Sequence, residues 1–401
     1  MRVQLDASFL TDPWQAYHDM AGRPVQHVAF PNGREGWLVT GYEEARTLLD
    51  DPRLSKDIRE ARTIWQDRTP PWARPALAEH MLHTDPPDHT RLRRLVNRSF
   101  TPRAVARLRA SIETIAGDLL DAMGEAGQAD LIDAFAFPLP IMVISELLGV
   151  PHADRDRLRA WSRDFVSRAP AEATARSVSQ FSAYLAELIE NKKSTPGDDL
   201  LSDLIQVSDG DERQLTSPEL ISMAFLLLVA GHETTVSLIS TAVFSLLVHP
   251  EQMNLLRARP NLIAAAVEEA LRYESPIHLS TLRFTTETVT VGEIEIPPRQ
   301  FVYISLPAAN RDPRRFHDPD EFDITRDTSG QLAFGHGVHF CVGAPLARLE
   351  GEIALRALLD RYETLELDGN EPDLGWRASL LVRGLQTLPV RYGGGSIFQP
   401  R

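Results

Sequence analysis

Residues 334–343 read Phe334-Gly335-His336-Gly337-Val338-His339-Phe340-Cys341-Val342-Gly343, and they contain the only cysteine of the 401-residue chain. A single cysteine cannot form an intramolecular disulfide, a zinc cluster or an iron–sulfur cluster, because each of these needs several ligands. Three roles remain open for Cys341 on chemistry alone: a buried inert thiol, a catalytic nucleophile, or a single thiolate ligand to haem iron.

The residues around Cys341 favour a ligand role over an inert thiol. Gly335, Gly337 and Gly343 allow tight backbone conformations and the close approach of a flat ligand. The apolar-periodic run 344–355 predicts a helix directly after the loop, with Pro345 in the first turn, where a missing N–H costs nothing. We therefore expect Cys341 at a helix N-terminus, where the helix dipole and free backbone N–H groups favour a thiolate over a thiol.

The pattern Phe-x-x-Gly-x-His-x-Cys-x-Gly, formed by residues 334–343, resembles the haem-binding loop of the cytochrome P450 family. That resemblance implies that Cys341 is the metal ligand, the axial thiolate of haem b (iron protoporphyrin IX). It also implies that Phe334, Gly335 and Gly343 belong to the cofactor-binding loop. A thiolate donates electron density toward the iron, which favours O–O cleavage.

A second segment, Ala230-Gly231-His232-Glu233-Thr234-Thr235, lies within a helix predicted over 220–249 that is apolar nearly all round before Ala230. Gly231 weakens the helix, and threonine hydroxyls can bond carbonyls one turn earlier, which often bends it. The residues alone allow a hydrogen-bonded kink or a proton relay. The segment resembles the oxygen-activating segment of the P450 family. That implies catalytic roles for Glu233 and Thr234, with His232 at a variable position.

Cationic and donor residues elsewhere suit the two propionates of a haem. His89 and Arg93 are four residues apart and share a predicted helix face, which is otherwise an ordinary solvated basic face. Propionates need cationic or donor partners. The resemblance implies cofactor-binding roles for His89, Arg93, Arg283, His339 and Ala230.

Glu269 and Arg272 are three residues apart on a predicted helix, a spacing that is common on solvated helices. Together with the cysteine loop they resemble the structural ion pair of the P450 family. The family's third partner is usually an arginine in a Pro-x-Arg-Phe element, where this chain has Glu321. We expect Arg326 to substitute for it.

The substrate pocket is predicted from helix spacing and from the resemblance. If Thr234 faces the haem, residues one and two turns earlier lie on the same side of the helix. The segment after the Glu269/Arg272 helix lies beside them by resemblance. An alternative reading of these positions is ordinary core. The expected pocket residues are Leu226, Leu227, Ala230, Ile277, His278, Leu279 and Leu380.

The order of predicted elements favours one mainly α domain with small β-sheets (α+β) over residues 1–401. Residues 25–30 and 36–40 flank Pro31-Asn32-Gly33, a strand–turn–strand signal. Most of the chain from there to about residue 273 has helical patterns. These include a helix capped at Thr101 that ends near residue 123, and one that starts at Ser217. Strand signals return at 282–291 and 301–304. The resemblance implies the P450 prism fold.

Charge and hydropathy exclude some functions. The net charge is −14, which argues against nucleic acid as a partner, since nucleic acid needs a basic surface. Residues 1–6 lack the apolar region of a signal peptide. The most apolar stretch, residues 221–231, is shorter than a membrane span. We therefore expect a cytoplasmic protein without a membrane partner.

The resemblance implies a haem-thiolate monooxygenase that hydroxylates or epoxidises a bulky hydrophobic molecule, macrolide-, polyketide- or steroid-like. It uses O₂ and electrons from a ferredoxin and an NAD(P)H-dependent ferredoxin reductase, and it is expected to be a monomer. Arg91, Arg94, Arg98 and Arg348 are the basic residues expected to bind the ferredoxin. A haem-thiolate peroxygenase or non-oxidative haem protein is the alternative, and a binding or sensing protein is a third class.

Overall fold

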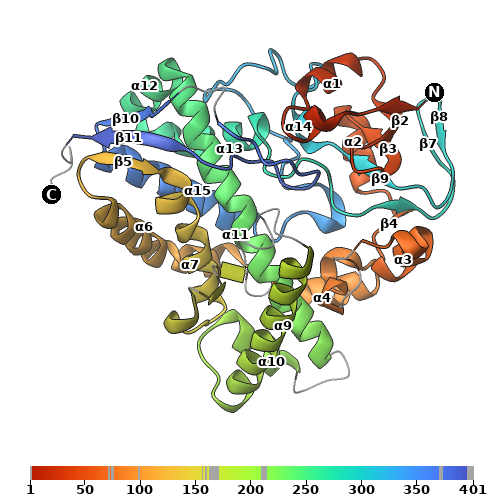
Figure 1. Cartoon of the computed structure of the whole chain (residues 1–401), viewed down its shortest axis with the longest axis horizontal. Coiled ribbons are helices and arrows are strands. Elements are labelled where there is room, and N and C mark those ends of the chain that lie inside the picture. Colours follow the sequence, from red (N-terminus) through yellow and green to blue (C-terminus); the bar gives the residue numbers. More distant parts are fainter. Residues whose placement is uncertain are drawn as a thin grey trace. The chain divides into compact units, whose positions relative to one another are not determined.

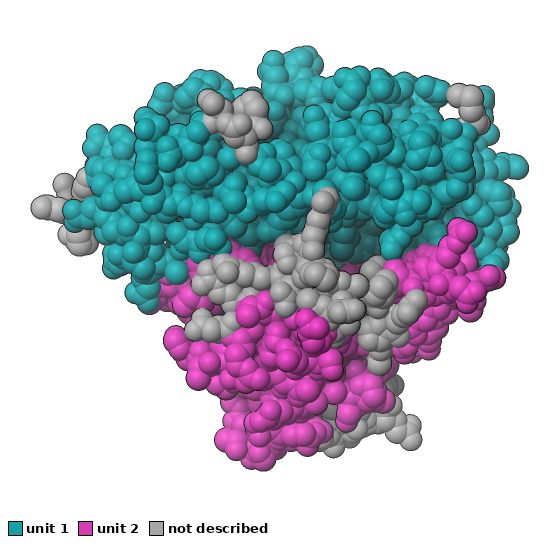
Figure 2. Space-filling model, in the orientation of Figure 1, with its two compact units in different colours: residues 1–56, 116–136, 234–401 teal, residues 57–115, 137–233 magenta. Residues whose placement is uncertain are grey.

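The computed structural model describes residues 2–70, 73, 76–97, 100–155, 157–158, 160–161, 171–208, 215–369 and 374–394. The chain divides into two compact units (Figure 2). Unit 1 comprises residues 1–56, 116–136 and 234–401, and unit 2 comprises residues 57–115 and 137–233.

The largest sheet described in unit 1 has four strands in the order β1-β2-β3-β9 (Figure 1). The hairpin β2–β3 is antiparallel and pairs Val25 with Val39, while β1 and β9 join it in parallel. The turn contains Gly33 at φ +77°, which a glycine adopts without strain. Strand–turn–strand was predicted at this position, and the structure confirms it. The strands are β1 (Val3–Gln4), β2 (Val25–Ala29), β3 (Glu35–Val39) and β9 (Val302–Ile304).

The two faces of this sheet pack against separate hydrophobic clusters. Successive residues of a strand point to opposite faces. Leu38 accordingly joins a cluster with Phe9, Phe30 and Leu279, whereas Val39 joins another with residues of the following helix. The smaller elements around the sheet are α1 (Trp14–Asp19), the 3₁₀ turn Ala7–Leu10, α2 (Tyr42–Leu49) and α14 (Leu306–Asn310).

Three smaller sheets complete the strands described in unit 1. Two are two-stranded, β4–β6 and β7–β8, and the third has the order β10-β11-β5, all antiparallel. The strands are β4 (Leu54–Ser55), β5 (Gly127–Asp130), β6 (Phe284–Thr285), β7 (Val289–Val291), β8 (Ile294–Ile296), β10 (Thr364–Leu367) and β11 (Pro389–Gly393).

Helices form most of the remainder of both units. Those wholly in unit 1 also include α12 (Pro250–Ala258), α13 (Ile263–Tyr273) and α15 (Ala344–Arg361). Unit 2 contains α3 (Ile58–Trp65), α4 (Asp88–Asn97), α5 (Pro102–Arg107), α7 (Pro138–Leu147), α9 (Ala171–Ser194) and α10 (Leu200–Ser208). The helix predicted from Thr101 to residue 123 starts and ends there, but it is interrupted at Leu108 into α5 and α6 (Arg109–Met123).

The long helix α11 (Ser217–Val248) has its N-cap at the residue before Ser217. The N–H of Glu219 donates to Oγ1 of Thr216 (3.3 Å), and the N–H of Thr216 donates to Oε2 of Glu219 (2.8 Å). This reciprocal pair is a capping box. The cap is therefore Thr216, and Ser217, which the sequence suggested for that role, is the first helical residue.

The length argument against a membrane span was wrong for α11. The helix continues past the polar segment to 32 residues and is long and apolar enough, by length and composition, to cross a membrane. The core helix of a soluble protein can have the same length and apolar composition. In this structure 67% of its most apolar window is buried, as in a core helix.

Candidate functional site

The loop that carries Cys341 is shaped by two glycines in unit 1. Gly335 and Gly337 have φ of +74° and +73°, which favour glycine. A Cβ on Gly337 would also overlap the carboxylate of Asp50. The backbone N–H of Cys341 donates to the carbonyl of Phe334 over 2.9 Å, which closes the loop. These features fix the cysteine at the end of the loop.

Helix α15 begins three residues after Cys341, as the sequence predicts. Gly343 is its N-cap residue and Pro345 lies in its first turn. The N–H of Ala344 donates to the carbonyl of Cys341 over 3.4 Å. Eighteen residues of aligned peptide dipoles therefore start beside an exposed sulfur, which favours its thiolate form.

The loop fits a flat ligand bound through sulfur. Cys341 is exposed. A Cβ built on Gly335 would meet no atom within 4 Å, and one on Gly343 would meet only Sγ of Cys341, at 3.9 Å. Open space beside two glycines and a single exposed thiol are what a haem–thiolate bond requires. The described residues contain no group of three or more His, Cys, Asp or Glu placed to hold a metal ion.

Two of the expected propionate partners lie in unit 1. Arg283 precedes β6 and is buried, with 5% of its surface exposed. His339 ends the short 3₁₀ turn before Cys341 and is half-buried. Both side chains can donate to a carboxylate, so both residue types suit a carboxylate-bearing ligand.

The other two expected partners lie on α4 in unit 2. His89 is buried, with 3% exposed, while Arg93 is half-buried. Nε of Arg93 donates to Oδ1 of Asn97 over 2.9 Å, one helical turn further on. Their neighbour Arg91 differs from the exposed residue that the sequence suggested, because it pairs with Glu219 and is only about a quarter exposed.

His232 and Glu233 form a buried polar pair on α11. Nδ1 of His232 lies 2.6 Å from the carbonyl of Leu228, and a carbonyl can only accept, so Nδ1 carries a proton. Nε2 of the same ring lies 3.1 Å from Oε1 of Glu233. The ring and the carboxyl group are therefore within hydrogen-bonding distance of each other. The sequence did not predict this contact, because His232 stands at a variable position of the motif.

Glycine at position 231 has a packing role in unit 2. A Cβ there would come within 2.9 Å of Cδ1 of Ile144, a residue of α7. Helix α11 continues through Gly231 without a break. Gly231 therefore permits close packing of two helices, and α11 is not interrupted at the polar segment.

The exposure of the α11 residues expected at the pocket is uneven. Ala230 is exposed and Thr234 is half-buried, although most residues of the helix are buried. Leu226 and Leu227 are only 8% and 5% exposed. Ala230 and Thr234, four apart on one face, are thus the positions with surface available to a ligand.

A pocket role for His278 and Leu279 needs correction. His278 is 1% exposed and Leu279 2% exposed, and Leu279 belongs to a core cluster beneath the four-stranded sheet. Nε2 of His278 lies 2.7 Å from the hydroxyl of Tyr17, and burial lowers the pKa of this histidine to about 3. Their neighbours Ile277 and Leu380 are half-buried. The sequence could not separate the buried pair from these neighbours, because the burial of His278 and Leu279 depends on contacts with Tyr17 and with core residues from distant segments.

A hollow of about 450 Å³ lies in unit 2. It is bordered by Trp161 and Tyr184, with the guanidinium of Arg157 5.1 Å from the centre of the Trp161 ring. None of the expected pocket residues lines it. We therefore attach no role in substrate binding to it.

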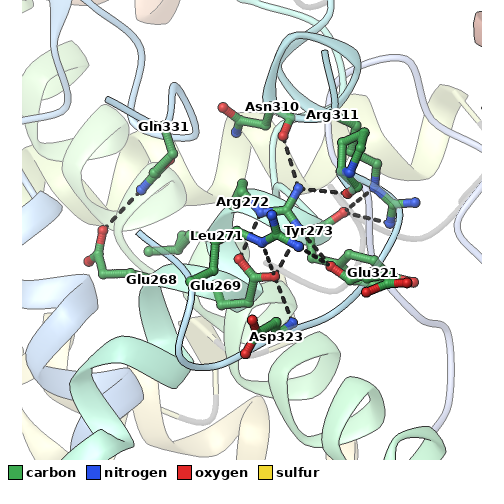
Figure 3. A network of polar contacts seen from close by, with 12 residues as sticks. Glu268, Glu269, Leu271, Arg272, Tyr273, Asn310, Arg311, Glu321, Asp323 and Gln331 are labelled. Atoms are coloured by element: carbon green, nitrogen blue, oxygen red, sulfur yellow. Dashed lines mark hydrogen bonds and ion pairs between the residues drawn. The ribbon is translucent and has the colours of Figure 1, made fainter. Parts of the chain in front are cut away.

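Glu269 and Arg272 form a fully buried ion pair at the end of α13 (Figure 3). Nε and Nη2 of Arg272 donate to the two carboxylate oxygens at 2.7 and 2.8 Å. The guanidinium also donates to the carbonyls of Asn310, Pro319 and Glu321 at 2.7–3.0 Å. A bidentate pair with every remaining donor satisfied is the condition under which a buried pair is sustained.

Arg326 occupies the third position of this network. Its Nε lies 3.3 Å from Oε1 of Glu269, and Nη2 donates to the carbonyl of Asp318 over 2.9 Å. The side chain of Glu321 does not take that place, since the carbonyl of Glu321 is what faces Arg272. The substitution suggested from the sequence agrees with this geometry.

A second arginine network beside it was not predicted. Arg311 donates to the carbonyl of Tyr273 and lies 3.6 Å from the ring centre of Trp14, and Arg383 donates to Glu274 over 2.6 Å. These pairs join residues 38 to 297 positions apart. No local spacing signals them, because their partners meet only in the folded chain.

Comparisons with known proteins agree on one family. The profile described as Cytochrome P450 matches residues 160–384. The chain is 50% identical to Cytochrome P450 107B1 of Saccharopolyspora erythraea, with 98% of each chain covered. It is 44% identical to 6-deoxyerythronolide B hydroxylase of the same organism, covering 96% and 98%. The solved structure of the tirandamycin C-bound P450 monooxygenase TamI is 45% identical, with a TM-score of 0.92 and coverage of 97% and 99%.

Proposed function

The chain belongs to the cytochrome P450 family, and from this membership we propose that it hydroxylates or epoxidises a bulky hydrophobic small molecule with one atom of O₂. It has the P450 fold and is a P450 monooxygenase. Membership implies a haem-iron cofactor, which we propose to be haem b.

The observation that carries the proposal is the exposed Cys341 in its glycine loop at the N-terminus of α15. The sulfur is the proposed metal ligand. Phe334, Gly335 and Gly343 shape its loop, and His89, Arg93, Arg283 and His339 are the proposed partners of the haem carboxylates, with Ala230 against the ring. When bound, a thiolate-ligated haem supplies the activation of O₂.

Glu233 and Thr234 are the proposed catalytic residues, and their task is to hold and move protons. Oε1 of Glu233 lies 3.1 Å from Nε2 of His232, so a second group that can carry a proton lies beside it. The hydroxyl of Thr234 can accept and donate at the same atom. The half-buried position of Thr234 next to the exposed Ala230 suits proton delivery while bulk water is restricted.

A macrolide-, polyketide- or steroid-like substrate is proposed. One relative is named for hydroxylation of 6-deoxyerythronolide B, and one solved relative holds tirandamycin C. Ala230, Ile277 and Leu380 are the proposed contacts with surface available, while Leu226 and Leu227 back them.

Bacterial members of the family generally receive electrons from redox partners and bind hydrophobic substrates. We propose a ferredoxin with an NAD(P)H-dependent reductase as the electron source here. We also propose that residues 1–401 act as one catalytic domain, as a monomer in the cytoplasm.

The experiment is the absorbance spectrum of the purified protein, reduced and exposed to CO. Thiolate ligation moves the Soret band strongly to the red, and Cys341→Ser should abolish that band because a neutral hydroxyl is a poor ligand. An unchanged band in the variant would reject Cys341 as the ligand. A wild-type protein without any Soret band would reject the proposal as a whole.

Substrate and oxidant are tested on the same preparation. Type I spectral shifts are measured with macrolides, steroids and polyketides, and turnover of a binding compound is compared with ferredoxin-delivered electrons and with hydrogen peroxide. Monooxygenase function predicts product with ferredoxin and O₂. Product from peroxide alone would favour the peroxygenase alternative.

A further inference from the structure

Four polar residues of unit 1, far apart in the sequence, form one chain of hydrogen bonds. Oγ of Ser305 donates to the hydroxyl of Tyr17 over 2.7 Å. That hydroxyl lies 2.7 Å from Nε2 of His278, and Nδ1 of His278 lies 3.2 Å from the carbonyl of Ser379. Tyr17, His278 and Ser305 are buried, so solvent has little access to these bonds. We call the four residues the Tyr17 chain.

Each bond of the Tyr17 chain has a definite direction. A carbonyl only accepts, so Nδ1 of His278 carries a proton and donates to Ser379. Burial lowers the pKa of His278 to about 3, so the ring is neutral near pH 7 and its Nε2 is an acceptor. The Tyr17 hydroxyl therefore donates to Nε2, and its oxygen accepts from Ser305.

The Tyr17 chain ties segment 276–280 to the segments on both sides of it. On one side, the backbone N–H of His278 donates to the carbonyl of Leu381 over 2.9 Å. On the other side, the carbonyl of His278 accepts from the N–H of Leu306 over 3.2 Å. The imidazole of His278 adds a second link to each neighbour, to the Leu381 segment directly and to the Leu306 segment through Tyr17.

Two proposed substrate contacts stand next to members of this chain. Ile277 precedes His278 and Leu380 follows Ser379, and both contacts are half-buried, with surface available to a ligand. Ile277 forms an isolated bridge with Val382 rather than part of a strand pair. A segment with few backbone bonds opens more easily than a strand does, so side-chain bonds matter more for its position.

We propose that Tyr17 and His278 are positioning residues of the substrate pocket, which fix Ile277 and Leu380 relative to each other. The inference rests on the proposed function, which assigns these two contacts to the substrate. It gives helix α1, which carries Tyr17, a part in ligand selection. An uncharged chain suits this task, because it holds two apolar contacts without placing a charge beside an apolar ligand.

Binding of two imidazoles of different size to the holoprotein tests the proposal without turnover. Both bind haem iron through a ring nitrogen and shift the Soret band. Imidazole itself needs no contact with the pocket wall, whereas clotrimazole is bulky and apolar. Tyr17→Phe removes one hydroxyl and keeps the ring. A hydrogen bond is worth a factor of about three to ten in an equilibrium constant. We expect Tyr17→Phe to weaken clotrimazole binding about three- to tenfold and imidazole binding less than about twofold.

The matched control is Tyr362→Phe. Tyr362 is fully buried, and its hydroxyl donates to the carbonyl of Gly124 over 2.9 Å, so this variant shows what the loss of a buried tyrosine hydroxyl does by itself. It should lower the thermal midpoint and leave the ratio of the clotrimazole and imidazole dissociation constants at the wild-type value. Equal ratios in wild type, Tyr17→Phe and Tyr362→Phe would overturn the proposal.

His278→Asn tests the same bond from its other end. The amide nitrogen of asparagine takes the place of Nδ1 and can still donate to Ser379, while the acceptor for Tyr17 is removed. Both substitutions break one bond, so the double variant should change the ratio no more than the larger of the two single changes. Full additivity would show that the two side chains act separately, and it would overturn the proposal.

The wild type separates this proposal from the proposed function. If the proposed function fails, the protein lacks the red-shifted CO band. If that band is present but clotrimazole binds no more tightly than imidazole, the assigned contacts do not reach the ligand, and the positioning role alone is overturned. If Tyr17→Phe does not fold, the ratio in His278→Asn decides: a rise supports the proposal, and the wild-type value overturns it.

Discussion

The proposed role of Thr234 in proton delivery can be tested by removing a single hydroxyl group. Thr234→Ala removes one hydroxyl from a half-buried position of α11. Proton delivery should become less controlled, so a smaller fraction of the NAD(P)H consumed should appear as product, with the remainder lost as hydrogen peroxide. The ratio of product to NAD(P)H with saturating substrate measures this.

The neighbouring threonine provides the control for that ratio. Thr235 is 3% exposed, so Thr235→Ala removes a hydroxyl from the core side of the same helix. The ratio of product to NAD(P)H should stay near the wild-type value in Thr235→Ala. If this ratio stayed at the wild-type value in Thr234→Ala as well, the Thr234 hydroxyl would be dispensable.

His278 makes folding stability depend on pH. Its pKa is lowered from 6.5 to about 3, first by burial and then by the charge of Arg383. Between pH 3 and 6.5 the unfolded chain binds a proton that the folded chain does not, so stability rises with pH in this window. Acidification below pH 6.5 should therefore cost about 1.4 kcal/mol of unfolding free energy per pH unit from this residue.

His278→Gln removes this titration and keeps hydrogen-bonding atoms for Tyr17. The variant should be less stable than wild type at pH 7.5, and the difference should shrink as the pH falls toward 5. Urea unfolding at several pH values supplies the two curves. Parallel curves would mean that His278 is not the group that titrates.

The network at the end of α13 shows how one element is tied to a loop. Arg326 is 11% exposed and joins Glu269 to the carbonyls of residues 317, 318 and 321. Arg326→Met removes the hydrogen bonds to these carbonyls and part of the positive charge that faces Glu269. We expect a loss of about 2–4 kcal/mol of unfolding free energy.

A surface arginine gives the comparison for Arg326. Arg391 is 57% exposed, and its Nε lies 3.4 Å from Asp368. Arg391→Met should cost less than about 1 kcal/mol, as exposed ion pairs do. The midpoint of urea unfolding by circular dichroism measures both variants. If Arg326→Met behaved like Arg391→Met, Arg326 would not belong to the network.

Elements were predictable where the signal is local. The strand–turn–strand at residues 25–40 and the helix after Cys341 follow from turn residues and apolar periodicity, and the structure has both. Strand β5 was missed, because Gly127-Gln128-Ala129-Asp130 has no β-branched or aromatic residue. It is a strand because it pairs with β11, more than 250 residues later.

The candidate site divides in the same way. Cys341 and the Glu269/Arg272 pair follow from short spacings that a reader of the sequence can see. The burial of His278 and Leu279 could not be predicted, because it depends on Tyr17 and on a core cluster formed by distant segments.

At the scale of the whole molecule, charge governs the encounter with an electron donor. A net charge of −14 repels an acidic ferredoxin unless a local basic surface steers it. Arg91 and Arg348 are engaged with Glu219 and Glu268, and Arg98 lies outside the described residues. Arg94 is exposed and is the basic residue to test.

Arg94→Glu should slow reduction by ferredoxin about tenfold at low ionic strength, and the difference should vanish as salt is raised. Substrate-induced spectral shifts should not change. Arg176→Glu, a charge reversal at an exposed position of α9, is the control for net charge. Stopped-flow reduction rates that are the same for both variants would place the donor elsewhere.

Because Cys341 is exposed, alkylation of its thiol can report which fraction of the chains holds haem. It is the only thiol in 401 residues. Each chain therefore offers an alkylating reagent one thiol if the sulfur is free, and no thiol if the sulfur is bound to iron. Chains without cofactor should take up one label per molecule, and iron-bound chains should be protected. Labelled and protected fractions should therefore add up to the whole preparation, and intact-mass spectrometry can read both. Full labelling of a haem-loaded sample would mean that the cofactor is held through another atom.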